Sequence, residues 1–347
     1  MKKSEKIVKQ KFSDYFNKWL YGEAGYYSNY KQIGKEGDFY TSVSTSSFFG
    51  GSIGKRVVDS IKEGTLPKDT TILEIGAHHG YLLADVIQFI YTLNPKLLET
   101  LNFAIVERFE KLQEQQVKYL KECFGDVVKI KHYKDISQVK LPHAFILANE
   151  IFDAFSCELV YTNKDNILQM AYVNENVKAH EIIFEYCNDE KLIAHCKKYK
   201  ITKGEVGLGY EEFVKNISNN IKKFEFITFD YGDRVPRNDF STRIYTNHEV
   251  FPIFEENLDL KKYFASADIT YDVYFTHLID CFKDCKIEDI SFKTQMLALV
   301  DFGIIELLEI LKENTDESTY LRESQKIKIL LEPTGMGDRF KMLHVKK

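Results

Sequence analysis

The feature that most constrains the fold of this 347-residue chain is a series of short apolar runs that begins at Thr70. Stretches with helical periodicity separate the runs. Apolar runs of about 4–8 residues that alternate with helices are typical of strands buried on both faces of a mainly parallel sheet. The predicted strands are residues 71–75, 102–106, 127–132, 144–148 and 225–229. We therefore expect an α/β fold in which helices cover both faces of the sheet.

Two further apolar runs close the chain, at residues 327–331 and 340–345. The turn-rich connection between them is too short for a crossover between parallel strands, so these runs are expected to form an antiparallel hairpin. The intervals between the core strands then become insertions that build a substrate-facing lobe. The expected organisation is N-terminal helices and a lid loop at 1–62, a core at 63–155, an insertion at 156–223, a core strand at 224–232, an inserted substrate lobe at 233–326 and the hairpin at 327–347.

Two amphipathic helices are predicted ahead of the sheet. Apolar residues at helical spacing, from Ile7 to Leu20, predict a first helix with Ser4 as its N-cap, and a second helix is predicted over residues 47–61. The stretch between them contains glycine and has no sustained periodicity, so it is expected to be an irregular loop. Long ordered loops of this kind often serve as lids.

Composition and charge exclude several classes of protein. The N-terminus has no apolar core of a signal peptide, and no window of about 18 apolar residues occurs, so no membrane span is expected. The six cysteines form no C-x-x-C pair and fit no disulfide framework, which predicts reduced thiols and a cytoplasmic protein. A net charge of −5 opposes non-specific adherence to nucleic acid, so no nucleic-acid partner is expected.

The segment TILEIGAHHGYLLADVI, from Thr71 onward, is a strand followed by a glycine-bounded turn and the start of a helix. In a doubly wound sheet, such a turn lies at the carboxyl edge, where ligands bind. Gly76 and Gly80 would let the backbone approach a cofactor closely. His78 and Tyr81 replace the second and third glycines of a G-x-G-x-x-G dinucleotide motif, which makes NAD less favoured. A tight turn in a nucleotide-free α/β fold remains the alternative.

Polar side chains also follow the other predicted strands. Glu107 comes directly after its strand, where a carboxylate can accept both hydroxyl groups of a ribose. Asp135 follows the third strand, where it could contact an adenine amine or simply lie in a surface loop. Asn149, Glu150 and Asp153 follow the fourth strand. The carboxyl ends of parallel strands meet at one edge, so a nucleotide-like ligand is predicted there.

Several motifs in this sequence resemble the MidA family of class I methyltransferases, which use S-adenosyl-L-methionine (SAM). The resemblance covers nearly the whole chain and rests on GDFYTS at 37–42, FFGGSIG at 48–54, LEIGAHHGYLLAD at 73–85, ANEIFDA at 148–154, GEV at 204–206, FDYGD at 229–233 and GMGDRFKML at 335–343. It implies a Rossmann-like, mainly parallel seven-stranded sheet with an antiparallel terminal hairpin, and SAM as cofactor. The mitochondrial members of this family are protein arginine methyltransferases that assist the assembly of respiratory complex I.

The resemblance also implies which residues contact SAM. They are Asp38, Phe39, Thr41, Glu74, Gly76, Ala77, Gly80, Glu107, Asp135 and Asn149. Two positions depart from the family pattern. Ala77 and His78 replace a proline and a glycine of the first motif, and Ser156 to Glu158 replace the usual residues after the fourth strand.

Candidate acceptor-binding residues follow from the chemistry of arginine. A guanidinium has a pKa above about 12, so carboxylates suit it because they hold the cation by paired hydrogen bonds and balance its charge. Glu150 and Asp153 are the leading candidates, and Glu205 is a third. Glu150 could instead accept from the SAM ammonium group, and Asp153 could cap the following segment. The resemblance adds Tyr231 and His248 as residues that line the acceptor channel, although His248 could be purely structural.

No metal site is expected, because the set His180, Cys187, His195 and Cys196 matches no common ligand spacing. Three functions remain open. The favoured one is a protein methyltransferase that acts on an arginine of a partner such as a respiratory-complex subunit. The others are a SAM-binding assembly chaperone without essential catalysis and a methyltransferase for a small molecule. The sequence does not predict the oligomeric state.

Overall fold

The computed structural model describes residues 8–29 and 41–347, which divide into two compact units. Of the described residues, the first unit contains 8–29, Phe152–Glu211 and Gly232–Leu278. The second contains 41–151, Glu212–Tyr231 and Ile279–Lys347. Residues 279–326, which were expected in the inserted lobe, therefore belong to the second unit. Among the described residues, no helix is both long and apolar enough to cross a bilayer.

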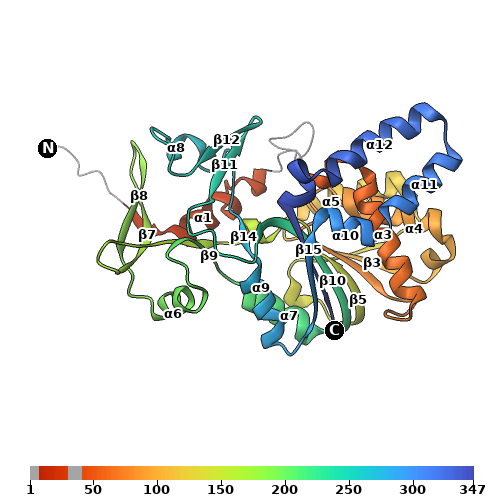
Figure 1. Ribbon diagram of the computed structural model, residues 1–347, viewed down its shortest axis with the longest axis horizontal. Coiled ribbons are helices and arrows are strands. Elements are labelled where there is room, and N and C mark those ends of the chain that lie inside the picture. The colour runs from red at the N-terminus through yellow and green to blue at the C-terminus, as the bar shows by residue number, and fades with distance from the viewer. Residues whose placement is uncertain (1–7, 30–40) are drawn as a thin grey trace. The chain divides into compact units, whose positions relative to one another are not determined.

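The second unit is built on a sheet with the strand order β15-β16-β10-β5-β2-β3-β4 (Figure 1). These strands are β2 (Thr71–Ile75), β3 (Asn102–Val106), β4 (Ile130–Tyr133), β5 (Leu141–Leu147), β10 (Ile221–Asp233), β15 (Asp289–Thr294) and β16 (Phe340–Lys346). Neighbours from β10 to β4 pair in parallel, and β16 runs antiparallel to both β10 and β15. This arrangement confirms the predicted class of fold, a mainly parallel sheet with an antiparallel strand near its edge.

The predicted pairing of residues 327–331 with the last strand is wrong. Those residues end α12 (Glu317–Leu331), and the antiparallel partner of β16 is β15. Ile327 and Leu330 lie three residues apart on the buried face of the helix, whereas Ile329 is 49% exposed. Asp316 caps the helix by accepting a hydrogen bond from the Thr319 N–H. The short apolar run is therefore the last part of an amphipathic helix, a case that periodicity alone cannot distinguish from a strand.

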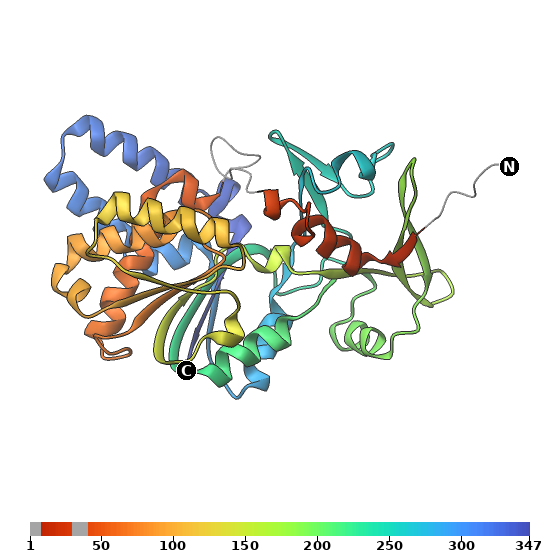
Figure 2. The ribbon, with the colours of Figure 1, turned by 180° about the vertical axis from the view of Figure 1, so that it is seen from behind.

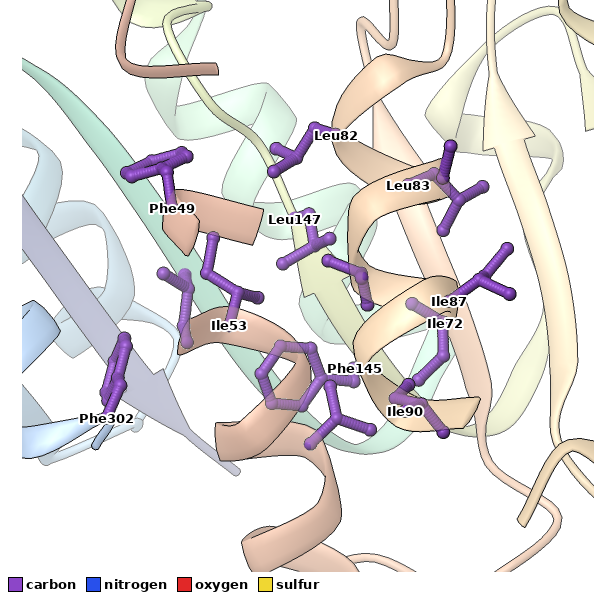
Figure 3. Close-up of a cluster of buried hydrophobic side chains, with 14 of the residues drawn as sticks. Phe49, Ile53, Ile72, Leu82, Leu83, Ile87, Ile90, Phe145, Leu147 and Phe302 are labelled. Atoms are coloured by element: carbon purple, nitrogen blue, oxygen red, sulfur yellow. The ribbon is translucent and has the colours of Figure 1, made fainter. Parts of the chain in front are cut away.

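One face of the sheet carries the main apolar core of the second unit (Figure 3). Helices α3 (Ser47–Lys62), α4 (Tyr81–Leu93), α10 (Gln295–Asp301), α11 (Ile304–Asn314) and α12 contribute to it. Figure 3 shows Phe49 and Ile53 from α3 and Leu82, Leu83, Ile87 and Ile90 from α4 beside the strand residues Ile72, Phe145 and Leu147. Helix α3, predicted over 47–61, is thus confirmed.

The glycines of the FFGGSIG motif allow α3 to approach α4 closely. A Cβ atom at Gly50 would lie 2.5 Å from the Asp85 Cβ, and one at Gly54 would lie 2.9 Å from the Val86 carbonyl oxygen. Both distances are shorter than a van der Waals contact. This motif therefore has a packing role next to the turn that begins α4.

The opposite face of the sheet is covered by α7 (Tyr210–Asn220) and α9 (Phe275–Asp284), as Figure 2 shows. Phe226 of β10 points to this face and its ring lies 5.2 Å from that of Phe282 in α9. Helices α2 (Ser42–Thr45) and α5 (Glu110–Phe124) complete the second unit. Helices therefore cover both faces of the sheet, as predicted.

The first unit consists of antiparallel sheets. One has the order β1-β7-β6-β9, with β8 also paired to β7, and the other has the order β12-β11-β13. The strands are β1 (Val8–Lys11), β6 (Cys157–Thr162), β7 (Leu168–Glu175), β8 (His180–Tyr186), β9 (Lys203–Gly207), β11 (Arg243–Thr246), β12 (Glu249–Pro252) and β13 (Asp268–Thr270). A short β14 (Val273–Tyr274) pairs with Gly232 and Asp233 at the end of β10. The helices include α1 (Phe12–Tyr21), α6 (Glu190–Tyr199) and α8 (Leu260–Tyr263).

The first predicted helix begins later than expected. Val8 belongs to β1 and is 48% exposed, and α1 starts at Phe12; Ser4 and Ile7 lie outside the described residues. The ladder that β1 forms with β7 satisfies backbone groups that a further helical turn would otherwise satisfy. From Phe12 onward the predicted apolar face is buried, and the Trp19 Nε1 donates to the Ala267 carbonyl at 2.7 Å.

Candidate cofactor and acceptor site

The turn between β2 and α4 has the left-handed backbone that its glycines allow. Gly76 and Gly80 have φ values of +74° and +82°, and His78 adopts +47° without being glycine. A left-handed conformation costs an ordinary residue roughly 1–2 kcal/mol. The His78 carbonyl accepts a hydrogen bond of 2.7 Å from the Gln116 Nε2, which holds the turn in place. The departure from glycine at position 78 is therefore accommodated in the structure.

Gln116 of α5 links three strand ends and was not identified from the sequence. Its side chain is fully buried, and its Oε1 lies 2.9 Å from the His132 Nε2 of β4. It also hydrogen-bonds to Glu107 after β3. A glutamine in an amphipathic helix carries no sequence signal for this role, since its partners are between 9 and 38 residues away along the chain.

Two buried acceptor atoms at the ends of β2 and β5 have no hydrogen-bond partner among the described residues. They are the Glu74 Oε2 and the Asn149 Oδ1. Burial, with Asp85 nearby, raises the pKa of Glu74 to about 8, although the Leu83 N–H acts in the opposite direction. Buried polar atoms in folded proteins are nearly always paired. A ligand that brings N–H donors to this edge, as the ammonium group of SAM does, would supply the missing partners.

The raised pKa of Glu74 predicts a pH-dependent stability for the ligand-free protein. The folded state holds this proton up to pH of about 8, whereas an unfolded glutamate loses it near the ordinary value of 4.5. Folded protein thus binds more protons in this window, so the free energy of unfolding should fall as pH rises through it. We expect Glu74→Gln to gain stability relative to wild type between pH 5 and pH 8, as measured by urea unfolding. A stability difference that stays constant with pH would contradict the assignment.

Glu107 follows β3 and is only 7% exposed. Its Oε1 accepts from the Phe109 N–H at 3.0 Å, and its own N–H donates to the Tyr133 carbonyl at 2.9 Å. Burial raises the pKa of Glu107, and the hydrogen bond from Phe109 opposes this rise. The carboxyl group is therefore held at the end of β3 next to β2, on the edge that the sequence predicted for a ribose.

Several other residues that were predicted to bind the cofactor stabilise the local structure. Asp135 accepts from the Ser137 N–H at 2.9 Å and caps a short 3-10 helix. Hydrogen bonding from the Ser137 side chain, and to a smaller extent from its N–H, lowers the pKa of Asp135. Thr41 caps α2 by accepting from the Ser44 N–H at 3.1 Å. Ala77 is buried beside the turn. Asp38 and Phe39 lie outside the described residues, as does most of the expected lid.

Glu150 follows β5, and Tyr231 lies near the end of the neighbouring strand β10, both in the second unit. Glu150 has a strained left-handed φ of +48°, and its N–H donates to the Phe229 carbonyl of β10 at 2.9 Å. The Asn149 Nδ2 donates to the Glu150 Oε1 at 2.9 Å. The Tyr231 ring lies 4.1 Å from the Phe340 ring at an angle of 35°, and 5.1 Å from the Arg339 guanidinium. Strained residues held by such contacts are concentrated at functional sites.

Asp153, Glu205 and His248 belong to the first unit. Burial raises the pKa of Asp153 to about 7, with Arg243 opposing and Asp272 adding to the rise. Glu205 accepts from the backbone and hydroxyl groups of both Ser241 and Thr242, at 2.6–2.9 Å. These four hydrogen bonds already use the acceptor positions of the Glu205 carboxylate, which therefore has a structural role.

His248 is exposed in the two-residue turn between β11 and β12. Both turn residues, Asn247 and His248, have left-handed φ values of +48° and +65°. This backbone is typical of a type I′ hairpin turn. The predicted role of His248 in an acceptor channel stays a prediction, and its evident role is to turn the chain.

The sheet order, the glycine-bounded turn after β2 and the carboxylate after β3 together define the class I SAM-dependent methyltransferases. Comparison with known proteins gives the family. Residues 52–291 match the model of the family described as "Putative S-adenosyl-L-methionine-dependent methyltransferase", and the chain belongs to this family. The chain is thus a methyltransferase whose cofactor is SAM, as the MidA-like motifs predicted.

Named relatives and a solved structure extend over most of the chain. The protein arginine methyltransferase NDUFAF7 of Xenopus laevis is 22% identical over 92% of this chain and 77% of its own length. Its Drosophila melanogaster homologue is 24% identical with the same coverage. A COG1565 superfamily member from Burkholderia thailandensis, solved with bound S-adenosyl-homocysteine, is 19% identical and has a TM-score of 0.84. The structural match covers 98% of this chain and 88% of the Burkholderia chain, which shows that the two proteins share a fold.

Proposed function

We propose that this enzyme transfers the methyl group of SAM to an arginine side chain of a partner protein. The observation that carries the proposal is Glu150, a carboxylate after β5 that has a strained backbone and accepts a hydrogen bond from the Asn149 Nδ2. Asn149 itself carries one of the two buried acceptor atoms that lack a partner among the described residues. The names of the relatives, protein arginine methyltransferases that match over 92% of this chain, support arginine as the acceptor.

Different residues of the second unit would bind different parts of SAM and the acceptor. Glu107 would accept from the ribose hydroxyls, and the orphan oxygens of Glu74 and Asn149 would accept from the ammonium group. SAM supplies an electrophilic methyl group on a sulfonium. Glu150 would hold the guanidinium by charge-assisted hydrogen bonds and direct one nitrogen at that carbon.

The reaction balances without a further co-reactant. The nitrogen lone pair forms the new N–C bond as the S–C bond breaks, and the electron pair of the S–C bond stays on sulfur, which gives S-adenosylhomocysteine. The methylated nitrogen then loses a proton to solvent. Glu150 would stabilise the cationic guanidinium until that proton leaves.

The particular partner and the compartment are part of the proposal. A respiratory-complex subunit is the partner that the family resemblance favours. A reducing compartment such as the cytoplasm is supported by the six cysteines, among which the structure has no disulfide bond.

Incubation of the enzyme with methyl-labelled SAM and native cell extract tests the proposed acceptor. We expect label in protein, and peptide mapping should place it on methylarginine. Label in extractable metabolites alone would contradict a protein acceptor and favour a small-molecule methyltransferase. Absence of label beside intact SAM binding would favour an assembly chaperone.

Removal of the Glu107 carboxylate should weaken SAM binding. Loss of a charge-assisted hydrogen bond costs roughly 1.5–3 kcal/mol, so Glu107→Ala should lose about 10- to 150-fold in affinity by calorimetry. Glu110→Ala is the matched control, because Glu110 lies three residues further on and is paired on the surface with Lys134. Equal affinities of the two variants would remove Glu107 from the site.

A further inference from the structure

Two histidines and a glutamate from three different helices meet in the first unit, away from the groups used above. His195 comes from α6, Glu211 from the start of α7 and His277 from the start of α9. One ligand atom from each lies within 4.8 Å of both others. The sequence gives no indication of this cluster, since its members are separated by 16 and 66 residues.

The contacts within the cluster are direct. The His277 Nε2 lies 2.7 Å from the Glu211 Oε1, and the His195 and His277 rings lie 4.5 Å apart at 79°. A tetrahedral zinc ion with bonds of about 2.0–2.1 Å needs ligand atoms about 3.4 Å apart. Side-chain rotations that move the ligand atoms by about 1 Å would therefore complete such a site, with no change in the helices.

Aromatic rings pack around the two imidazoles. Tyr199 lies 4.6 Å from His195, and Tyr210 lies 5.1 Å from His277. His277 is only 4% exposed, whereas Glu211 is exposed and His195 is half-buried. The cluster is thus closed at the His277 side and open to solvent at the Glu211 side, where an ion could enter.

Two members of the cluster, His195 and Glu211, have protonation states that suit metal ligands. Burial, with His277 nearby, lowers the pKa of His195 to about 4, so this imidazole is neutral near pH 7. The hydrogen bond from His277 lowers the pKa of Glu211 to about 2, so this group is a carboxylate. Metals bind neutral imidazoles and ionised carboxylates.

We propose that His195, Glu211 and His277 form a binding site for a divalent transition-metal ion, with zinc as the ion that fits this ligand set best. Two imidazoles and a carboxylate are three of the four ligands that zinc takes, and a water molecule would occupy the fourth position. The ion would join α6 to the first residues of α7 and α9. The set His180, Cys187, His195 and Cys196 forms no such cluster: Cys187 and Cys196 pack in an apolar core, and His180 contacts Tyr15.

Zinc titration of chelator-treated, tag-free protein against a chromophoric competitor tests this site. We expect one equivalent of zinc to bind and to raise the thermal midpoint. His195→Ala and Glu211→Gln should each weaken binding by at least about 10-fold, since even indirect disturbance of a zinc site costs that much. Glu211 is exposed, so its variant should fold normally even if a variant of the buried His277 does not.

His143→Ala is the matched control for the titration. His143 also has a carboxylate neighbour, since its Nε2 lies 3.5 Å from the Asp69 Oδ1, but it belongs to no three-ligand cluster within residues 8–29 and 41–347. Its replacement should leave zinc binding unchanged. The proposal is overturned if wild type binds no zinc at a tenfold excess, or if His195→Ala and Glu211→Gln bind it as tightly as wild type.

Discussion

Replacement of Glu150 by glutamine should reduce turnover by about 100-fold or more while SAM affinity changes little. Glutamine keeps the shape and one acceptor but removes the charge that a guanidinium requires. Turnover would be measured as methylarginine formed on the identified acceptor, and SAM affinity by calorimetry. Glu110→Gln, a neutralised surface carboxylate, should behave as wild type in both measurements.

The same variant separates two roles for Glu150. If Glu150 holds the SAM ammonium group instead of the acceptor, cofactor affinity and turnover should fall together. Parallel losses would thus contradict the acceptor role, and full activity would contradict both roles. The existing hydrogen bond from the Asn149 Nδ2 to Glu150 can persist with glutamine, so a general loss of structure is not expected.

Replacement of Glu225 by alanine should destabilise the protein by about 3–5 kcal/mol, because it leaves the largely buried Arg56 guanidinium without this counter-ion. Glu225 is fully buried on β10. Its Oε1 accepts from the Arg56 Nε at 2.6 Å and lies 2.7 Å from the His344 Nε2. Burial acts to raise its pKa, but the bonds from His344, Arg56 and Ser60 outweigh it and bring the pKa to about 2. Urea unfolding would measure the loss.

Glu63→Ala provides the internal control for this prediction. Glu63 also pairs with Arg56, at 3.1 Å, but its side chain is 53% exposed. An exposed ion pair contributes at most about 1 kcal/mol. A loss below about 1 kcal/mol for Glu225→Ala as well would contradict the buried network as a source of stability.

The bounds of strands β2 and β3 could be predicted to the residue from the sequence. Strand β15 of the same sheet could not be predicted. Thr71–Ile75 and Asn102–Val106 are apolar runs bounded by turn residues, a pattern that is typical of strands buried on both faces. β15, DISFKT, lies at the sheet edge and alternates polar with apolar residues over six positions. The apolar run at 327–331 therefore indicates a strand more strongly than β15 does, although it ends a helix.

The site residues that could be predicted are likewise those whose role follows from the local sequence. Gly76, Gly80 and Glu107 could be predicted because each role follows from a position at a strand end. The hydrogen bonds of Gln116 and the meeting of His195 with Glu211 and His277 depend on how helices pack. Glu205 could be identified as an unusual acid in a GEV motif, but only the fold shows that four donors already occupy it.

A crystal structure of this enzyme with S-adenosylhomocysteine would show where the cofactor binds. We expect ligand density over the turn from Gly76 to Gly80, with the ribose hydroxyls within hydrogen-bond distance of Glu107. The ammonium group should lie next to the Glu74 Oε2 or the Asn149 Oδ1, the atoms that otherwise have no partner among the described residues. Density elsewhere on the chain, or a ligand that leaves both oxygens unpaired, would contradict the proposed site.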